Sequence, residues 1–393
     1  MIETRSIANA EFFDNEAARI SELSRELAER FLAGGRLLAI GLTPQDLSDA
    51  HHVAVEFVHP VIVGKRALPA LALRPDELER LATPVDAVIA FGMPARAPDG
   101  CLTIGFAPGA ATWVFDPPTT EPLIRQELVE TLYHVLWETV HVYLEHLGSS
   151  GSGAGASGFL YPFLERDAES SLGRVRDDVA ASVRAKAREV GALREQTIGD
   201  GSHIAAVADV IGERFAAGAK VLALGNGGSA TDAADLVADL HALGWPAVDL
   251  TADSAILTAL ANDIGPAVLF QRQVIAHGLP GDVAVAFSTS GGSPNVLEAL
   301  AEARRRGLVT VAIVGYGGGQ ITGRLADHVI SVDSDYVPRI QEAQATVYHL
   351  LCELVPAGPE SARQIGPGTT ASNASLLEPS PSPVSTRRLV QRS

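Results

Sequence analysis

The chain has 393 residues, of which 47% are hydrophobic and 20% charged, and its formal net charge is −17. This length predicts two domains, and the composition is typical of soluble globular ones. The acidity argues against a nucleic acid or an anionic membrane as partner. An acidic amino terminus, unlike that of a signal peptide, and the lack of an apolar run of about 18 residues predict a cytoplasmic protein without a membrane span.

The predicted elements begin with a domain over residues 1–147. The first strand candidate lies in RFLAGGRLLAIG (30–41), and four further strand candidates follow: ALPALAL, VDAVIAFG, CLTIGFAP and ATWVFDPP. A helix then closes the domain with RQELVETLYHVL (125–136). Residues 148–158 contain only glycine, serine and alanine, which predicts a flexible linker.

A second domain is predicted over residues 159–355. Its strand candidates are KVLALG, PAVDLT, DVAVAFS, VTVAIVG and HVISV, and they alternate with helical patterns. Such alternation predicts a parallel sheet with helices on both faces, a Rossmann-like, flavodoxin-type α/β architecture. Residues 356–393 are rich in proline, serine and glycine and are predicted to be disordered.

The two domains are predicted to be copies of one another. RFLAGGRLLAIG resembles RFAAGAKVLALG (214–225), the strands follow in the same order, and the closing helix recurs as IQEAQATVYHLL (340–351). Where the second copy has a loop and a helix between its third and fourth strands, the first has only GMPARAPDG. A parallel crossover usually needs a dozen or more residues. We therefore expect the first copy to lack this helix and to have a rearranged sheet at that edge.

Two loops of the second copy have the chemistry of a phosphate site. GNGGS (225–229) and STSGGS (288–293) each end a strand and begin a helix, at the sheet edge where ligands of such folds bind. Glycines let backbone N–H groups approach a phosphate, hydroxyls donate to it, and helix N-termini attract its charge.

These loops, with ALANDIG and the helix RIQEAQATVYH, resemble the SIS (sugar isomerase) fold and its phosphoheptose isomerase family over residues 202–355. The family interconverts sedoheptulose 7-phosphate and a heptose 7-phosphate. The resemblance implies that the substrate and its phosphate are bound by Asn226, Gly227, Gly228, Ser229, Asp263, Ser288, Thr289, Ser290, Ser293 and Gln341.

The resemblance also implies a proton-transfer pair, Asp239 and His349, and in some members a divalent metal such as zinc, bound with Asp235 and Gln341. No nucleotide cofactor is expected. The chain departs from the family here, because Asp235 replaces a histidine and Asp239 a glutamate. The shorter side chain can shift a base by about an ångström, which matters for rate. Asp232, nearby, is expected to be a cap or loop residue.

The first copy keeps the residues that the second has lost. DAHHVAVEF (49–57) aligns with DAADLVADL (232–240), so that His52 and Glu56 take the places of Asp235 and Asp239. Gln126 and His134 match Gln341 and His349. These first-copy residues are therefore candidate metal ligands, and Glu56 and His134 are candidate catalytic residues.

Gln126 and His134 are eight residues apart, about 12 Å along a helix, whereas ligands of one zinc ion lie within about 4 Å of each other. One helix can hardly supply both. The spacing therefore predicts composite sites, each drawing on the closing helices of both copies in a fused pseudo-dimer.

The sequence thus predicts an aldose–ketose isomerase of a phosphorylated sugar, most simply sedoheptulose 7-phosphate, that transfers a proton by means of a base. The alternative is a non-catalytic SIS protein that senses a sugar phosphate or serves as an assembly factor, which the altered acids would favour. The tetrameric habit of the family implies a homo-oligomer, a dimer of tandem chains.

Overall fold

The computed structural model describes residues 2–60, 64–148, 172–321 and 324–358. Apart from residues 148 and 356–358, the predicted linker and tail lie outside these ranges. Within them, no helix is long and apolar enough to cross a membrane.

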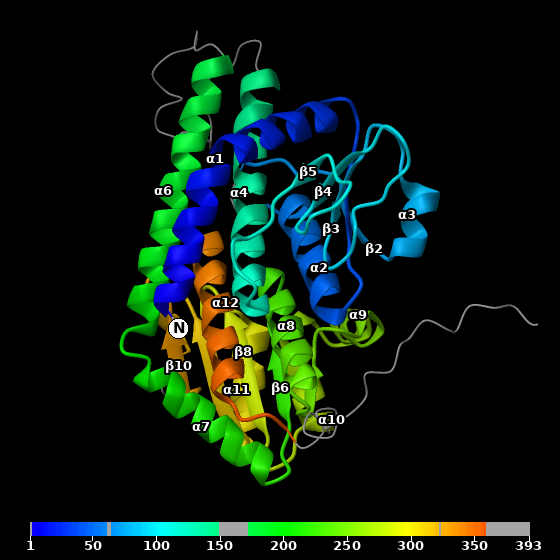
Figure 1. Cartoon of the computed structure of the whole chain (residues 1–393). Coiled ribbons are helices and arrows are strands. Elements are labelled where there is room, and N and C mark those ends of the chain that lie inside the picture. The colour runs from blue at the N-terminus through cyan, green and yellow to red at the C-terminus, as the bar shows by residue number, and fades with distance from the viewer. Residues whose placement is uncertain (1, 61–63, 149–171, 322–323, 359–393) are drawn as a thin grey trace, which may run out of the picture.

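The first half consists of one sheet, a long helix before it and another after it (Figure 1). Its elements are α1 (Ile2–Leu32), β1 (Leu37–Ile40), α2 (Pro44–Val58), β2 (Ala70–Leu73), α3 (Pro75–Leu81), β3 (Ala87–Ala90), β4 (Leu102–Gly105), β5 (Trp113–Val114) and α4 (Pro122–Gly148).

The second half begins with two helices and continues as an alternation of strands and helices. Its elements are α6 (Leu172–Ile198), α7 (Ser202–Ala216), β6 (Val221–Leu224), α8 (Gly228–Ala242), β7 (Ala247–Asp249), α9 (Ser254–Asp263), α10 (Leu269–His277), β8 (Val283–Ser288), α11 (Pro294–Arg305), β9 (Val309–Val314), β10 (His328–Ser331) and α12 (Val337–Leu354).

The two sheets have the same topology. Each has five parallel strands, in the order β2-β1-β3-β4-β5 in the first half and β7-β6-β8-β9-β10 in the second. In both halves the first strand of the half therefore lies between its second and third strands. The predicted α/β architecture with two flavodoxin-type sheets is confirmed.

The helix predicted to be missing from the first copy is indeed missing, since residues 91–101 contain none between β3 and β4. The expected rearrangement of the sheet edge, however, is wrong. β4 pairs with β3 in parallel, Ala87 opposite Leu102. Both strands have only four residues and are about 13 Å long, so a short extended segment is enough to return the chain to the start of the next strand.

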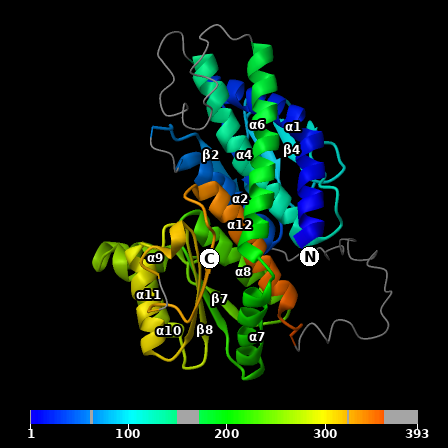
Figure 2. The same ribbon diagram turned by 90° about the vertical axis from the view of Figure 1, so that its left-hand side faces the viewer.

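Helices from both halves pack together between the sheets (Figures 1 and 2). α2 lies against α8, and α4 lies against α12. α6 packs along α1, and its Val175, Val179 and Val183 belong to the same hydrophobic core as Phe12 and Phe13. The polar side chains of α2, α4, α8 and α12 that face this interface are thereby buried, and they form the candidate site.

Candidate active site

The helices that follow the two glycine-rich loops, α8 and α11, each begin without a side-chain cap. Among the described residues, no side chain accepts a hydrogen bond from the first turn of α8, which follows Gly227, or of α11, which follows Ser293. A pair of hydrogen bonds of 2.8 and 2.9 Å joins the side-chain amides of Asn226 and Asn295, which fixes the two loops to each other. Two uncapped N-termini held side by side are suited to bind an anion.

The close turn of the first loop requires glycine. A Cβ on Gly225 would lie 2.1 Å from the carbonyl oxygen of Ser229. In the second loop, the Ser288 hydroxyl accepts a hydrogen bond from the N–H of Gly291 at 3.1 Å, and Ser290 is exposed. Each loop thus ends a strand and begins a helix, as the sequence predicted, and phosphate binding by the loops stays a prediction.

Three further residues predicted to bind the phosphate or the sugar differ in their exposure to solvent. Ser229 is buried at the start of α8, and Thr289 is half-buried in the second loop. Asp263 is exposed at the end of α9, where its carboxylate accepts a hydrogen bond from Asn262 at 2.8 Å.

Four buried side chains from both halves, which we call the mixed quartet, meet around the Nε2 atom of His52. This atom lies 3.3 Å from Nε2 of His134, 3.4 Å from Nε2 of Gln341 and 3.9 Å from Oε1 of Glu56. His52 and Glu56 come from α2, His134 from α4, and Gln341 from α12 of the other half. The glutamine is therefore contributed by the opposite copy, as the spacing of Gln126 and His134 predicted.

The mixed quartet lies directly against the first glycine-rich loop, which the sequence predicts to bind phosphate. A Cβ on Gly228, the first residue of α8, would lie 1.9 Å from Nε2 of Gln341 and 2.9 Å from Nε2 of His52. Any larger residue at position 228 would force one or both of these side chains to move. The first half thus brings its histidines and Glu56 to the phosphate loops of the second half.

Two residues that sequence reasoning missed orient the histidines of the quartet. The Tyr133 hydroxyl lies 3.0 Å from Nδ1 of His52, and Oε1 of Glu342 lies 3.2 Å from Nδ1 of His134. A partner on Nδ1 fixes the ring and directs Nε2 toward the quartet. Glu342 comes from α12, so this support also crosses between the halves.

Burial sets the charges in the mixed quartet. It lowers the pKa of His52 well below its usual value, and the neighbouring His134 lowers it further. Burial also raises the pKa of Glu56 to about 7. The site therefore holds a neutral imidazole and a carboxyl that can gain or lose a proton near neutral pH.

The donor set of the mixed quartet fits a divalent metal. One donor atom from each of His52, Glu56 and His134 lies within 4.8 Å of the others. In the described part of the chain, Oε2 of Glu56 and Oε1 of Gln341 are buried without a hydrogen-bond partner. Two imidazole nitrogens with a carboxylate and an amide oxygen are ligands that zinc accepts, and a carboxamide can present its oxygen by turning over.

The corresponding residues of the second copy lie elsewhere. Asp239 is about three helical turns, or 16 Å, along α8 from Gly228. Its Oδ2 lies 3.8 Å from Nε2 of His349, and its Oδ1 accepts a hydrogen bond from Gln45 of the first half at 3.4 Å. Asp239 and Gln126 line a cavity beside the loops of the first copy. Asp239 is therefore not beside the phosphate loops of its own copy.

Further carboxylates are buried between the halves. Asp232, expected to be a cap or loop residue, instead lies within α8 with 1% of its surface exposed. Neither of its oxygens forms a hydrogen bond within the described ranges. Burial raises the pKa values of Asp49, Glu130, Asp232 and Asp235, and neighbouring carboxylates raise them further.

Two parallel five-stranded sheets of the same topology, each flanked by helices, define the class of duplicated α/β proteins. Residues 187–315 match the family model described as SIS domain. The C-terminal domain of glucosamine-fructose-6-phosphate aminotransferase from Francisella tularensis superposes on 90% of this chain and 94% of its own, with a TM-score of 0.59 and 10% identity. This likeness concerns the fold alone.

Closer relatives share the sequence of the carboxyl-terminal half. The phosphoheptose isomerase of Geobacter sulfurreducens is 43% identical over 185 residues, which are 46% of this chain and 96% of that protein. That of Rhodospirillum rubrum is 45% identical over 158 residues, 39% of this chain and 84% of that protein. The chain therefore belongs to the SIS family of phosphosugar isomerases, and its carboxyl-terminal half is related to the phosphoheptose isomerases.

Proposed function

We propose that the chain is an aldose–ketose isomerase that converts sedoheptulose 7-phosphate to a heptose 7-phosphate at one composite site. The observation that carries this proposal is the contact of Gly228 with His52 and Gln341. It joins an anion-binding helix N-terminus of one copy to the titratable groups of the other. Neither copy has both parts.

The two loops of the second half bind the phosphate of the substrate. The uncapped N-termini of α8 and α11 present backbone N–H groups, and the hydroxyls of Ser288, Ser290 and Ser293 add donors. With the phosphate fixed there, the carbonyl end of the sugar extends toward the mixed quartet.

The chemistry belongs to Glu56 and His134. Glu56, with a pKa of about 7, is suited to take a proton from the carbon next to the carbonyl and to return it one carbon along. His134, held by Glu342, moves a proton between the two oxygens. When a divalent metal is bound by the mixed quartet, it polarises the carbonyl oxygen as negative charge develops.

The test is turnover of sedoheptulose 7-phosphate by the full chain, followed by NMR, after metal removal and with or without added zinc. We expect an aldose product whose rate falls by about 100-fold or more in His134→Ala, because general acid–base groups contribute that much. Ser290→Ala should mainly raise KM. His349→Ala is the matched control, because the duplication places it away from the phosphate loops.

A loss of activity in His349→Ala with full activity in His134→Ala would refute the composite site. Thermal stabilisation by the sugar phosphate without any product would instead identify a non-catalytic sensor. If the substrate neither reacts nor stabilises the protein, the heptose assignment is wrong.

A further inference from the structure

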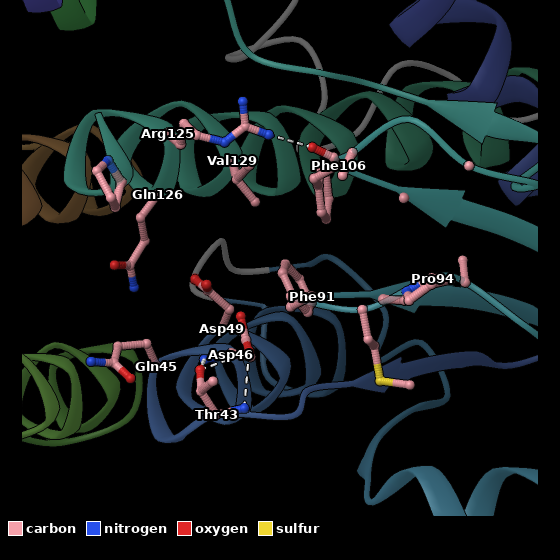
Figure 3. A pocket seen from close by; sticks show the side chains of 18 of the residues that line it. Thr43, Gln45, Asp46, Asp49, Phe91, Pro94, Phe106, Arg125, Gln126 and Val129 are labelled. Atoms are coloured by element: carbon pink, nitrogen blue, oxygen red, sulfur yellow. Dashed lines mark hydrogen bonds between the residues drawn. The ribbon is translucent and has the colours of Figure 1, made fainter. Parts of the chain in front are cut away.

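The first half has its own cavity, of about 620 Å³, at the carboxyl end of its sheet (Figure 3). The loops after β3 and β4 and the first turns of α2 and α4 line it, and Asp239 of the second half completes it. By the duplication it corresponds to the phosphate-binding region of the second half. Its chemistry, however, is different.

At the N-terminus of α2, the place that a phosphate would occupy is taken by a side chain of the protein. α2 begins with a capping box, in which the Thr43 hydroxyl accepts from the N–H of Asp46 at 3.2 Å, and the Asp46 carboxylate accepts from the N–H of Thr43 at 2.9 Å. A Cβ on Gly92 would lie 2.1 Å from that carboxylate. A phosphate at this helix N-terminus would meet a negative charge already in place.

The floor of the cavity is acidic, and its nearest cation is engaged. Asp46, Asp49 and Asp239 all line the cavity. The Arg125 guanidinium donates instead to the Asp116 carboxylate and to backbone carbonyl oxygens, one of them that of Phe106. It is turned toward the loop backbone in Figure 3. The acidic floor therefore has no counter-charge from this arginine.

One floor carboxylate is buried with an unused acceptor. Asp239 is 6% exposed, and among the described residues its Oδ2 accepts no hydrogen bond. Nε2 of His349 lies 3.8 Å from it. A buried carboxylate oxygen without a partner is unfavourable, and a donor that entered the cavity would stabilise it.

The walls of the cavity are largely apolar. Phe91 and Phe106 stack with their ring centroids 5.2 Å apart, and Met93, Pro94 and Val129 also contribute to the lining. Aromatic and aliphatic walls above an acidic floor match a molecule with an apolar body and a positively charged end.

We propose that this cavity binds a small organic ammonium ion and excludes phosphorylated ligands. The ammonium group lies on the floor against Asp239, and the body of the ligand lies between the aromatic walls. The site is separate from the isomerase site, and it does not depend on the proposed isomerase activity.

The test is calorimetric titration of the full chain at pH 7 with benzylamine, with benzyl alcohol as its uncharged match and with inorganic phosphate. We expect benzylamine to bind at least about tenfold more tightly than benzyl alcohol, since a charge-assisted hydrogen bond is worth that much. Asp239→Asn should abolish most of this preference. The exchange keeps the shape of the side chain, and folding is checked by thermal melting.

Ser290→Ala is the control, because it alters the phosphate loops and should leave benzylamine binding unchanged. Equal binding of benzylamine and benzyl alcohol would overturn the proposal. So would unchanged benzylamine binding in Asp239→Asn, or displacement of bound benzylamine by phosphate. The absence of any benzylamine binding up to about 10 mM, weaker than roughly −3 kcal/mol, would also overturn it.

Discussion

Each closing-helix histidine is held by a glutamate of the opposite copy. Nδ1 of His134 lies 3.2 Å from Glu342, and Nδ1 of His349 lies 3.1 Å from Glu127. The four residues are almost fully buried. Because Glu127 and Glu342 occupy equivalent positions in the duplicated helix, the exchange is reciprocal, and it follows the pseudo-twofold relation of the copies.

The residue scale gives a first prediction. Glu342→Gln should lower kcat by about 10- to 100-fold with little change in KM, because a neutral amide holds Nδ1 of His134 less firmly than the carboxylate does. A loss confined to kcat is the result that general destabilisation would not produce. Steady-state kinetics measure kcat and KM separately.

Glu127→Gln is the matched control for that prediction. Glu127 is equally buried and also binds an arginine, Arg5, at 2.9 Å, as Glu342 pairs with Arg339. It supports His349 rather than His134. Equal losses of kcat in both variants would show that the effect comes from general destabilisation and not from the composite site.

At the scale of elements, α2, α4 and α8 place carboxylic acids inside the protein that form no salt bridge with any described residue. Burial raises the pKa values of Asp49, Glu130, Asp232 and Asp235. Such groups keep their protons in the folded state at a pH where the unfolded chain releases them. The free energy by which they destabilise the folded protein is therefore small below their pKa values in the unfolded chain, near 4. It grows as pH rises toward and through their pKa values in the folded protein.

We therefore expect the metal-free protein to lose stability between about pH 5 and pH 8. Glu56, whose pKa is raised to about 7, contributes within this window. Asp232→Asn should raise the melting temperature at pH 8 more than at pH 5, because it removes a charge that burial makes unfavourable. Thermal melts at the two pH values measure this.

The exposed Asp209 on α7 provides the comparison, and Asp209→Asn should not alter the pH dependence.

Buried acids with lowered pKa values stabilise the folded protein, and this stabilisation changes only at lower pH. Despite their burial, Glu127 and Glu138 have pKa values of about 2, because of their cationic partners. Their stabilisation is lost only as pH falls from about 4.5 toward 2.

Much of the fold and part of the site could be predicted from local pattern. The repeated strand pattern gave both sheets, and the distance between Gln126 and His134 along one helix indicated a composite site. The roles of Asp232 and Glu342 could not be predicted, because both depend on which helix faces them. An aspartate near a helix start reads as a cap, and only packing against α2 and α4 buries it.

On the scale of the whole molecule, the halves are held together by buried contacts. Arg339 of the second half binds Glu138 of the first at 3.1 Å, both fully buried, and the Ser48 hydroxyl donates to the carbonyl of Thr231 at 2.9 Å. Leaving one member of a buried ion pair unpaired costs about 3–5 kcal/mol. Separation of the halves would break such contacts.

A protease recognition sequence inserted between residues 148 and 172 tests this. After cleavage, we expect the two fragments to elute together in size-exclusion chromatography and to keep the activity of the uncut protein. Fragments that separate under native conditions would show that the covalent connection, rather than the interface, holds the composite site together.

The metal content of the whole chain gives a further prediction. We expect one tightly bound zinc ion per chain. The helix that follows the first strand carries a histidine, His52, only in the first copy, and Asp235 takes its place in the second. Native mass spectrometry should show the ion lost in His52→Ala and retained in Asp235→Ala. Two equivalent zinc ions per chain would contradict this asymmetry.

The duplication inside one chain also changes what a single substitution does. In a dimer of identical subunits, every exchange of an amino acid occurs twice, so both pockets are altered together. Here a substitution in one copy alters one pocket only. Asp46, for example, caps α2 in the first half, whereas the equivalent helix of the second half, α8, has no side-chain cap. Fusion of the two copies thus releases the protein from its own symmetry, and one pocket can acquire a new ligand while its twin retains the old one.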